Sequence, residues 1–149
     1  MAAAQRLPTP PPLEGYTRES NELGGSGFNG VVFRERCNAT GELVAVKYLW
    51  RAELQQAPSG STSTLERELR NHALNIHPNI ASFQKALLTP EWVAIVIELC
   101  EGKNLLAWLN EQPGNRASEA LARGVIAQVL SAMSHMHGIG IVHRDIKAR

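Results

Sequence analysis

The fold is decided by residues 24–47, which read GGSGFNGVVFRERCNATGELVAVK. In this stretch Gly25, Gly27 and Gly30 have the spacing G-x-G-x-x-G. Glycine lets backbone amides approach a phosphate group closely, because it has no side chain and tolerates positive φ. The pattern alone also fits an ordinary glycine-rich turn. A dinucleotide-binding fold is disfavoured, because Val31–Phe33 continues as a strand instead of opening a helix.

A lysine lies inside the strand predicted at the end of this stretch, where residues 44–47 read VAVK. Strand alternation sends the side chains of Ala45 and Lys47 to the same face. An ammonium group there is costly to bury unless anions meet it, and phosphate oxygens or a carboxylate would do so. Glu68, on the margin of a predicted helix, is such a carboxylate. The alternative is that Lys47 reaches water past the strand edge and Glu68 is solvated.

A charged pentapeptide follows the last apolar stretch, and residues 143–147 read HRDIK. The carboxylate of Asp145 could accept a proton, and two cations, Arg144 and Lys147, could offset the charge of a transferring phosphoryl group. By itself the pentapeptide also fits an exposed charged loop. In this order, after a glycine turn, a strand lysine and a helix glutamate, the combination is specific.

The remaining sequence predicts an α+β chain. We expect three antiparallel strands within residues 16–49, joined by a turn at 38–41, and two more strands over 80–88 and 92–99. A helix is expected after Ser63, which has the capping-box spacing to Glu66. Its apolar stripe comprises Leu65, Leu69, His72 and Ile76. Further helices are expected over 105–109 and, capped by Ser118, over about 119–137.

Composition restricts the class of protein. The 149 residues carry 15 basic and 14 acidic side chains, for a formal charge of +1, and 44% are hydrophobic. The basic surplus of a nucleic-acid binder is missing, and no apolar run approaches the roughly 18 residues of a membrane span. Cys37 and Cys100 cannot alone build a disulfide framework or a zinc site. We expect a cytoplasmic or nuclear protein with no nucleic-acid, membrane or metal-site partner; its oligomeric state stays open.

The first 15 residues differ from the rest. They include Pro8, Pro10, Pro11 and Pro12, which favour an extended, solvated backbone. We expect a flexible lead-in over residues 1–15, and the alternative is a ligand for a proline-recognition domain.

Taken together, the motifs resemble those of the eukaryotic protein kinases from about Tyr16 to Arg149. The matching segments are the glycine loop at 25–32, VAVK at 44–47, Glu68 nine residues before HPNI at 77–80, and HRDIK at 143–147. A lysine two positions after Asp145 is typical of serine/threonine-specific members. Residues 67–80 and 87–98 are similar to the plant-type sucrose-non-fermenting-related kinases of the second class.

The resemblance implies a two-lobed α+β fold. An antiparallel N-lobe sheet with one regulatory helix would occupy about 16–97, a hinge about 98–102, and the first helices of an incomplete C-lobe 103–149. The implied activity is transfer of the γ-phosphoryl group of MgATP to serine or threonine hydroxyls of a protein substrate.

The resemblance also implies a role for each matching residue. The nucleotide would be bound by Gly25, Ser26, Gly27, Phe28, Asn29, Gly30, Val32, Ala45, Lys47, Glu68, Glu98 and Cys100. Lys47 would hold the α- and β-phosphates and pair with Glu68, and Ile97 would guard the back of the adenine pocket. Asp145 would accept or orient the substrate hydroxyl, and Lys147 would steady the phosphoryl group.

Two departures from the family pattern matter. Gly24 follows Leu23, so the loop is one residue longer, and Asn29 stands where the family has an aromatic residue. The family's Mg²⁺ ligands would fall beyond residue 149. We therefore expect these residues alone to be inactive; the alternatives are a catalytically incompetent nucleotide-binding or interaction module, and a fragmentary gene model.

Overall fold

The computed structural model describes residues 9–19, 23, 30–56 and 62–148. The chain divides into two compact units, residues 1–66 with 83–99 and residues 67–82 with 100–149. The first unit is built on a sheet and the second is mainly helical, as expected for an α+β chain. Among the described residues, none of the helices has the length and apolar character needed to cross a membrane.

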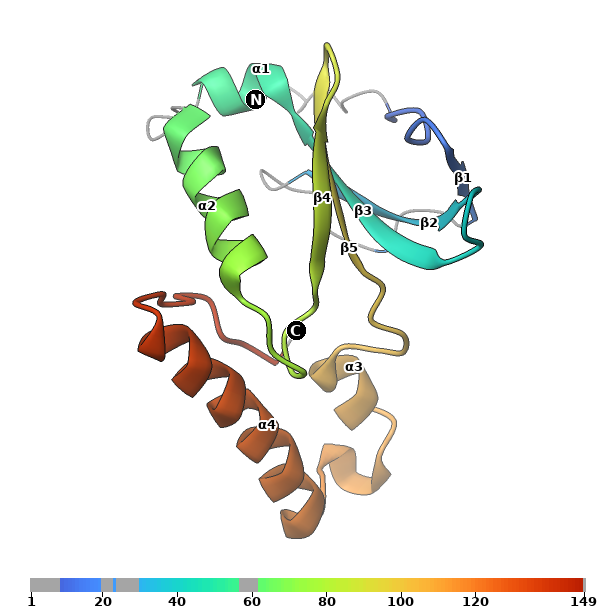
Figure 1. Cartoon of the computed structure of the whole chain (residues 1–149). Coiled ribbons are helices and arrows are strands. Elements are labelled where there is room, and N and C mark those ends of the chain that lie inside the picture. Colours follow the sequence, from blue (N-terminus) through green and yellow to red (C-terminus); the bar gives the residue numbers. More distant parts are fainter. Residues whose placement is uncertain (1–8, 20–22, 24–29, 57–61, 149) are drawn as a thin grey trace, which may run out of the picture. The chain divides into compact units, whose positions relative to one another are not determined.

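Within the described residues of the first unit, five strands form one antiparallel sheet (Figure 1). Their order across the sheet is β1 (Tyr16–Arg18), β2 (Val31–Cys37), β3 (Leu43–Trp50), β5 (Trp92–Glu98) and β4 (Phe83–Leu88). The predicted turn between β2 and β3 is confirmed, with the Gly41 amide donating to the Cys37 carbonyl at 2.8 Å. Beside that turn, Gln84 Nε2 of β4 donates to Glu42 Oε1 at 3.0 Å.

One face of the sheet carries the hydrophobic core. Its buried members from the strands are Phe33, Val44, Val46, Tyr48, Trp92, Ala94 and Val96. The rings of Phe33 and Tyr48 meet edge to face at 6.0 Å between centroids, and those of Tyr48 and Trp92 at 6.4 Å. Such edge-to-face pairs add to the free energy gained from burial. We call this side of the sheet the core face.

Residues 9–15, which we call the strap, lie against the core face. Leu13 is only 6% exposed and joins the core cluster, and Pro10 is fully buried. The Gly15 carbonyl accepts from the Asn38 amide at 2.9 Å, which ties the end of the strap to the β2–β3 turn. The expectation of a flexible lead-in is therefore wrong for these residues. Its apolar side chains pack there because their burial removes apolar surface from water.

Two helices follow β3. The first, α1 (Arg51–Gln56), is not predicted by the sequence pattern; its Arg51 amide donates to the Glu91 carbonyl of the β4–β5 turn at 3.0 Å. The second, α2 (Thr62–Leu74), begins one residue before the expected N-cap Ser63, whose side chain lies outside the described residues. It ends two residues early, and Ile76 is 84% exposed, so its place in the apolar stripe is wrong.

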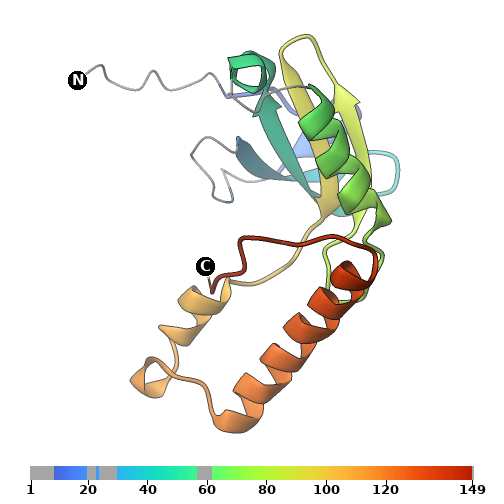
Figure 2. The same ribbon diagram turned by 90° about the vertical axis from the view of Figure 1, so that its left-hand side faces the viewer.

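In the second unit, α3 (Leu105–Leu109) is followed by a 3-10 turn η1 (Pro113–Asn115) and by α4 (Glu119–Gly138) (Figure 2). Side chains cap both helices at their N-termini. The Asn104 carboxamide accepts from the Ala107 amide at 2.8 Å, and the Ser118 hydroxyl accepts from the Leu121 amide at 3.3 Å. The chain beyond α4 returns to α3, where the Leu106 amide donates to the Ala148 carbonyl at 2.7 Å.

Candidate functional site

The side of the sheet opposite the core face brings together several predicted site residues. Directly paired residues of antiparallel strands share a face. Val32 pairs with Lys47, and Lys47 pairs with Ile95 on β5. One row away, Ala45 pairs with Ile97. We call this side the nucleotide face, and it carries Val32, Ala45, Lys47 and Ile97 together.

Burial on the nucleotide face suits a mixed apolar and charged ligand. Ala45 is 6% exposed and Ile95 is 8% exposed, while Lys47 is half-buried between them. The flanking residues Val46 and Tyr48 turn to the core face and are buried there. An anion stabilises an ammonium group on a largely apolar strand face, so this face can accept a phosphate-bearing ligand.

The last glycine of the motif has a conformation that its neighbours enforce. Gly30 has φ +81°, in the left-handed region. A Cβ built at this position would lie 2.1 Å from the Tyr48 carbonyl oxygen and 2.9 Å from Leu49 Cδ2. Glycine is therefore required here on two grounds, the backbone angle and the close approach of β3. The other loop residues, 25–29, lie outside the described residues.

Sequence reasoning missed a charged residue of the nucleotide face, as well as the apolar Ile95. Arg34 pairs with Ala45 and so lies on the same face, and its Nε is buried without a hydrogen-bond partner in the described part of the chain. An unpaired buried donor suits an acceptor-rich ligand. The available signal was strand alternation, because Arg34 is in phase with Val32.

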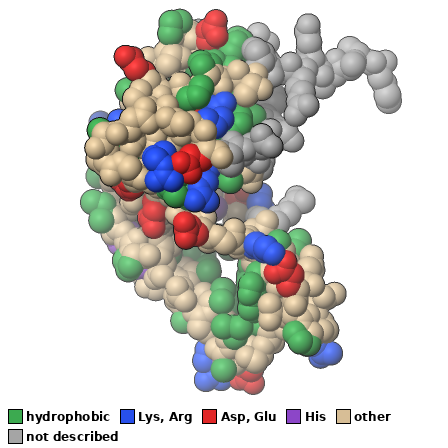
Figure 3. Space-filling model, turned by 90° about the vertical axis from the view of Figure 1, so that its right-hand side faces the viewer, with side chains coloured by type: hydrophobic (Ala, Val, Ile, Leu, Met, Phe, Trp, Pro, Cys, Tyr) green, Lys and Arg blue, Asp and Glu red, His purple; other side chains and the backbone are tan. Residues whose placement is uncertain are grey.

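The sheet also carries exposed charged side chains. Figure 3 shows basic and acidic side chains interspersed on one side of the molecule. Arg36 of β2 forms an ion pair with Glu19. The hydrogen bond from Arg36 lowers the pKa of Glu19 below its usual value, and the charges of Arg36 and Arg34 add to this effect. Because both partners are solvated, we expect this pair to add little to stability.

In the second unit, the HRDIK segment is an exposed turn. Lys147 Nζ lies 2.6 Å from Asp145 Oδ2, and the Asp145 amide donates to His143 Nδ1 at 3.2 Å. Arg144 has φ +65°, which is unusual for a residue other than glycine. Strained backbone of this kind is concentrated at functional sites. The carboxylate and the ammonium therefore lie side by side, and their roles in the reaction stay predictions.

A comparison with family models decides the family. The model of the protein kinase domain matches residues 18–149, which is most of the chain. The chain belongs to the protein kinase family. Its N-lobe sheet and its partial helical C-lobe are the fold that the resemblance implied.

Curated kinases give the same assignment. The chain is 38% identical over 123 residues to serine/threonine-protein kinase SAPK9 of Oryza sativa subsp. japonica, which covers 83% of this chain and 32% of SAPK9. It is 39% identical over 123 residues to serine/threonine-protein kinase SRK2A of Physcomitrium patens, covering 83% of this chain and 33% of SRK2A. The similarity to the plant-type sucrose-non-fermenting-related kinases of the second class is confirmed at this moderate identity. The chain spans about a third of the length of these relatives.

The remaining kinase residues are distributed over both units. Glu98 ends β5 in the first unit, whereas Glu68 of α2, Cys100 and the Asp145–Lys147 pair belong to the second. Glu68, Cys100 and Asp145 are all exposed. The ion pair between Lys47 and Glu68 and the convergence of Asp145 on the phosphates therefore stay predictions.

Magnesium is implied by the family. Among the described residues, no three or more histidine, cysteine, aspartate or glutamate side chains are grouped so that they could hold a metal ion. The described residues thus offer no all-protein cage for a metal ion, and the position of the family's Mg²⁺ ligands beyond residue 149 stays a prediction.

Proposed function

We propose that the protein is a serine/threonine protein kinase in which the nucleotide face binds ATP and Asp145 acts on the substrate hydroxyl. The observation that carries the proposal is the position of Lys47. Lys47 lies half-buried on the same face as Val32, Ala45 and Ile97. Two residues before Val32, which pairs with Lys47, Gly30 has a geometry that excludes a side chain. The family match and the named serine/threonine kinases among the relatives support it.

Each residue has a part in this proposal. Val32 and Ala45 contact the adenine, Ile97 lies behind it, and the backbone of Glu98 and Cys100 hydrogen-bonds its edge. Lys47 neutralises phosphate charge that would otherwise be desolvated on an apolar face. Asp145 orients the serine or threonine hydroxyl of a protein substrate, and Lys147, held 2.6 Å from it, offsets charge on the transferring group. We place the protein in the cytoplasm or nucleus.

For the 149 residues by themselves, we propose nucleotide binding without phosphoryl transfer. This second function is favoured because these 149 residues span about a third of the length of the relatives, and the resemblance places the family's Mg²⁺ ligands beyond residue 149. An N-lobe sheet with an intact nucleotide face would still recognise adenine and phosphate.

The test is a titration of the purified chain with a fluorescent N-methylanthraniloyl-ATP (mant-ATP). We expect saturable binding that unlabelled ATP displaces and that Lys47→Met weakens at least about tenfold, because an apolar side chain leaves phosphate charge unmet. Lys85→Met is the matched control, since Lys85 pairs with Val96 and so lies on the core face of the same sheet. Equal binding by the wild type and Lys47→Met would reject the proposal.

A further inference from the structure

The hairpin of β1 and β2 carries the glycine motif in its connection, and in β1 Tyr16 alone contributes apolar packing against the core that helps fix the register. β1 has three residues and lies at the edge of the sheet. Its pairs are Tyr16 with Cys37, Thr17 with Arg36, and Arg18 with Glu35. A slip of one residue would move β1 by about 3.3 Å and turn each of its side chains to the opposite face.

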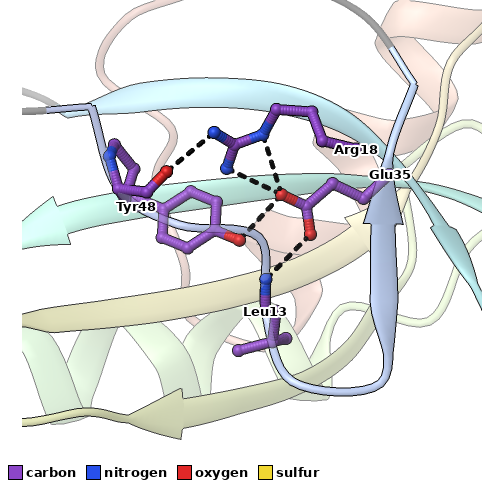
Figure 4. Close-up of polar contacts among 5 residues, drawn as sticks. Leu13, Arg18, Glu35 and Tyr48 are labelled. Carbon is purple, nitrogen blue, oxygen red and sulfur yellow. Dashed lines mark hydrogen bonds and ion pairs between the residues drawn. The ribbon is translucent and has the colours of Figure 1, made fainter.

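A buried ion pair lies across this hairpin, on the core face (Figure 4). Glu35 is fully buried, and its Oε1 accepts from Arg18 Nη2 at 2.9 Å and from Arg18 Nε at 3.2 Å. The Arg18 guanidinium lies 3.6 Å from the centroid of the Phe33 ring, over its face. The fork geometry of the guanidinium restricts the pair to one relative position of the two strands.

The strap and β3 complete the environment of this pair. Arg18 Nη1 donates to the Pro10 carbonyl at 2.7 Å, and the Leu13 amide donates to Glu35 Oε2 at 3.3 Å. From β3, the Tyr48 hydroxyl donates to Glu35 Oε1 at 2.8 Å. Both carboxylate oxygens and three guanidinium nitrogens are therefore bonded within the first unit.

We propose that the Arg18–Glu35 pair, hydrogen-bonded to the strap, fixes the register of the β1–β2 hairpin and so positions the residues that bind phosphate. We call this pair the register lock. In a slipped register the Arg18 side chain would leave the core face, and the Glu35 carboxylate would stay buried without its cation, at a high free-energy cost. The only other ion pair on this hairpin among the described residues, Arg36–Glu19, is solvent-exposed and discriminates weakly between registers. The positioning role rests on the proposed nucleotide binding; the register lock does not.

The decisive variant replaces both partners by neutral polar side chains, Arg18→Gln with Glu35→Gln, because this removes both charges without adding apolar side chains that would themselves favour the native register. Two measurements are made at a temperature well below the midpoint of thermal unfolding. The first is the set of cross-strand backbone NOEs of Thr17 in the NMR spectrum. The second is the Kd for mant-ATP.

We expect the wild type to show NOEs from Thr17 to Arg36 alone, and the double variant to add contacts to the residue at position 35 or to Cys37. If the native register and one slip in each direction are equally populated, a third of the molecules remain competent and the apparent Kd rises about threefold. Tyr48→Phe is the control. It removes one hydrogen bond from the same carboxylate, lowers the stability, and leaves the cross-strand pair, so both the NOEs and Kd should stay as in the wild type.

A double variant that retains the single Thr17–Arg36 contact and the wild-type Kd would overturn the inference. If the double variant does not fold, Glu35→Gln decides, because it keeps the shape of the side chain and removes only its charge: mixed NOEs support the lock, and an unmixed register rejects it. If the wild type binds no mant-ATP, the proposed function fails, and the NOEs still test the register.

Discussion

Replacing Gly30 by alanine tests whether the approach of β3 to the end of the glycine motif is as tight as the structure has it. The residue has φ +81°, and an alanine in the left-handed region costs about 1–2 kcal/mol. The added Cβ would also lie 2.1 Å from the Tyr48 carbonyl oxygen, so backbone must shift by about 1 Å to restore ordinary contact of roughly 3.3 Å. Overpacking of this kind adds about 1–3 kcal/mol. We expect Gly30→Ala to lower the free energy of unfolding by about 2–5 kcal/mol.

Gly41→Ala separates the two contributions. Gly41 has φ +74°, but no atom lies within 4 Å of a Cβ built there, so only the backbone cost of about 1–2 kcal/mol applies. Urea unfolding followed by tryptophan fluorescence measures both variants, because Trp92 is buried in the core of the same sheet. Equal losses of stability for the two variants would refute the close approach. In mant-ATP titrations Gly30→Ala should also weaken binding, whereas Gly41→Ala should not.

Three further outcomes follow from the packing. Leu13→Ala should lower the free energy of unfolding by about 2–5 kcal/mol in urea, since the strap side chain is buried; a loss below about 0.5 kcal/mol would show that the strap does not pack. Burial, with the Glu35 hydrogen bond, raises the pKa of Tyr48. The free energy of unfolding should therefore hold below about pH 10 and fall above it, and it should fall less steeply in Tyr48→Phe. Parallel pH profiles of melting temperature for the two proteins would contradict this. Asn104→Ala should cost about 1 kcal/mol by removing the cap on α3, measured against Asn110→Ala.

The nucleotide face could be predicted from local sequence because strand alternation is a local property. Once β3 is recognised, Ala45 and Lys47 must share a face, and the observed register adds Val32 and Ile97 to it. The caps Asn104 and Ser118 are equally local, although only Ser118 was predicted. The face of a strand on which a side chain lies, and the cap at a helix end, depend on neighbouring residues in the sequence. Both can therefore be predicted from the local sequence.

The Arg18–Glu35 lock could not be predicted, because it depends on contacts distant in sequence. Residues 34–36 read RER, three charged side chains in a row, and nothing in that run indicates which one faces the core. Glu35 is in phase with Phe33, but its burial also requires the Leu13 amide 22 residues away and the Tyr48 hydroxyl. The packing of the strap also depends on contacts distant in sequence. The prolines alone therefore led to the expectation of a flexible segment.

The end of α2 was misjudged for a different reason. The expected apolar stripe ran through Ile76, which requires the helix to continue to that residue. The helix instead stops at Leu74, where Asn75 Nδ2 donates to the Asn71 carbonyl at 2.8 Å and competes with the helical backbone pattern. Ile76, counted in the apolar stripe, is consequently turned to solvent.

The central claim is that one face of the sheet, and not the other, receives a nucleotide. The most direct measurement is an NMR titration of the chain with a non-hydrolysable ATP analogue, followed through the amide and methyl resonances of β2, β3 and β5. The account predicts that shifts concentrate at Val32, Ala45, Lys47 and Ile97, while Phe33, Val46 and Val96 on the core face change little. Shifts concentrated on the core face, or none at saturating analogue, would contradict it.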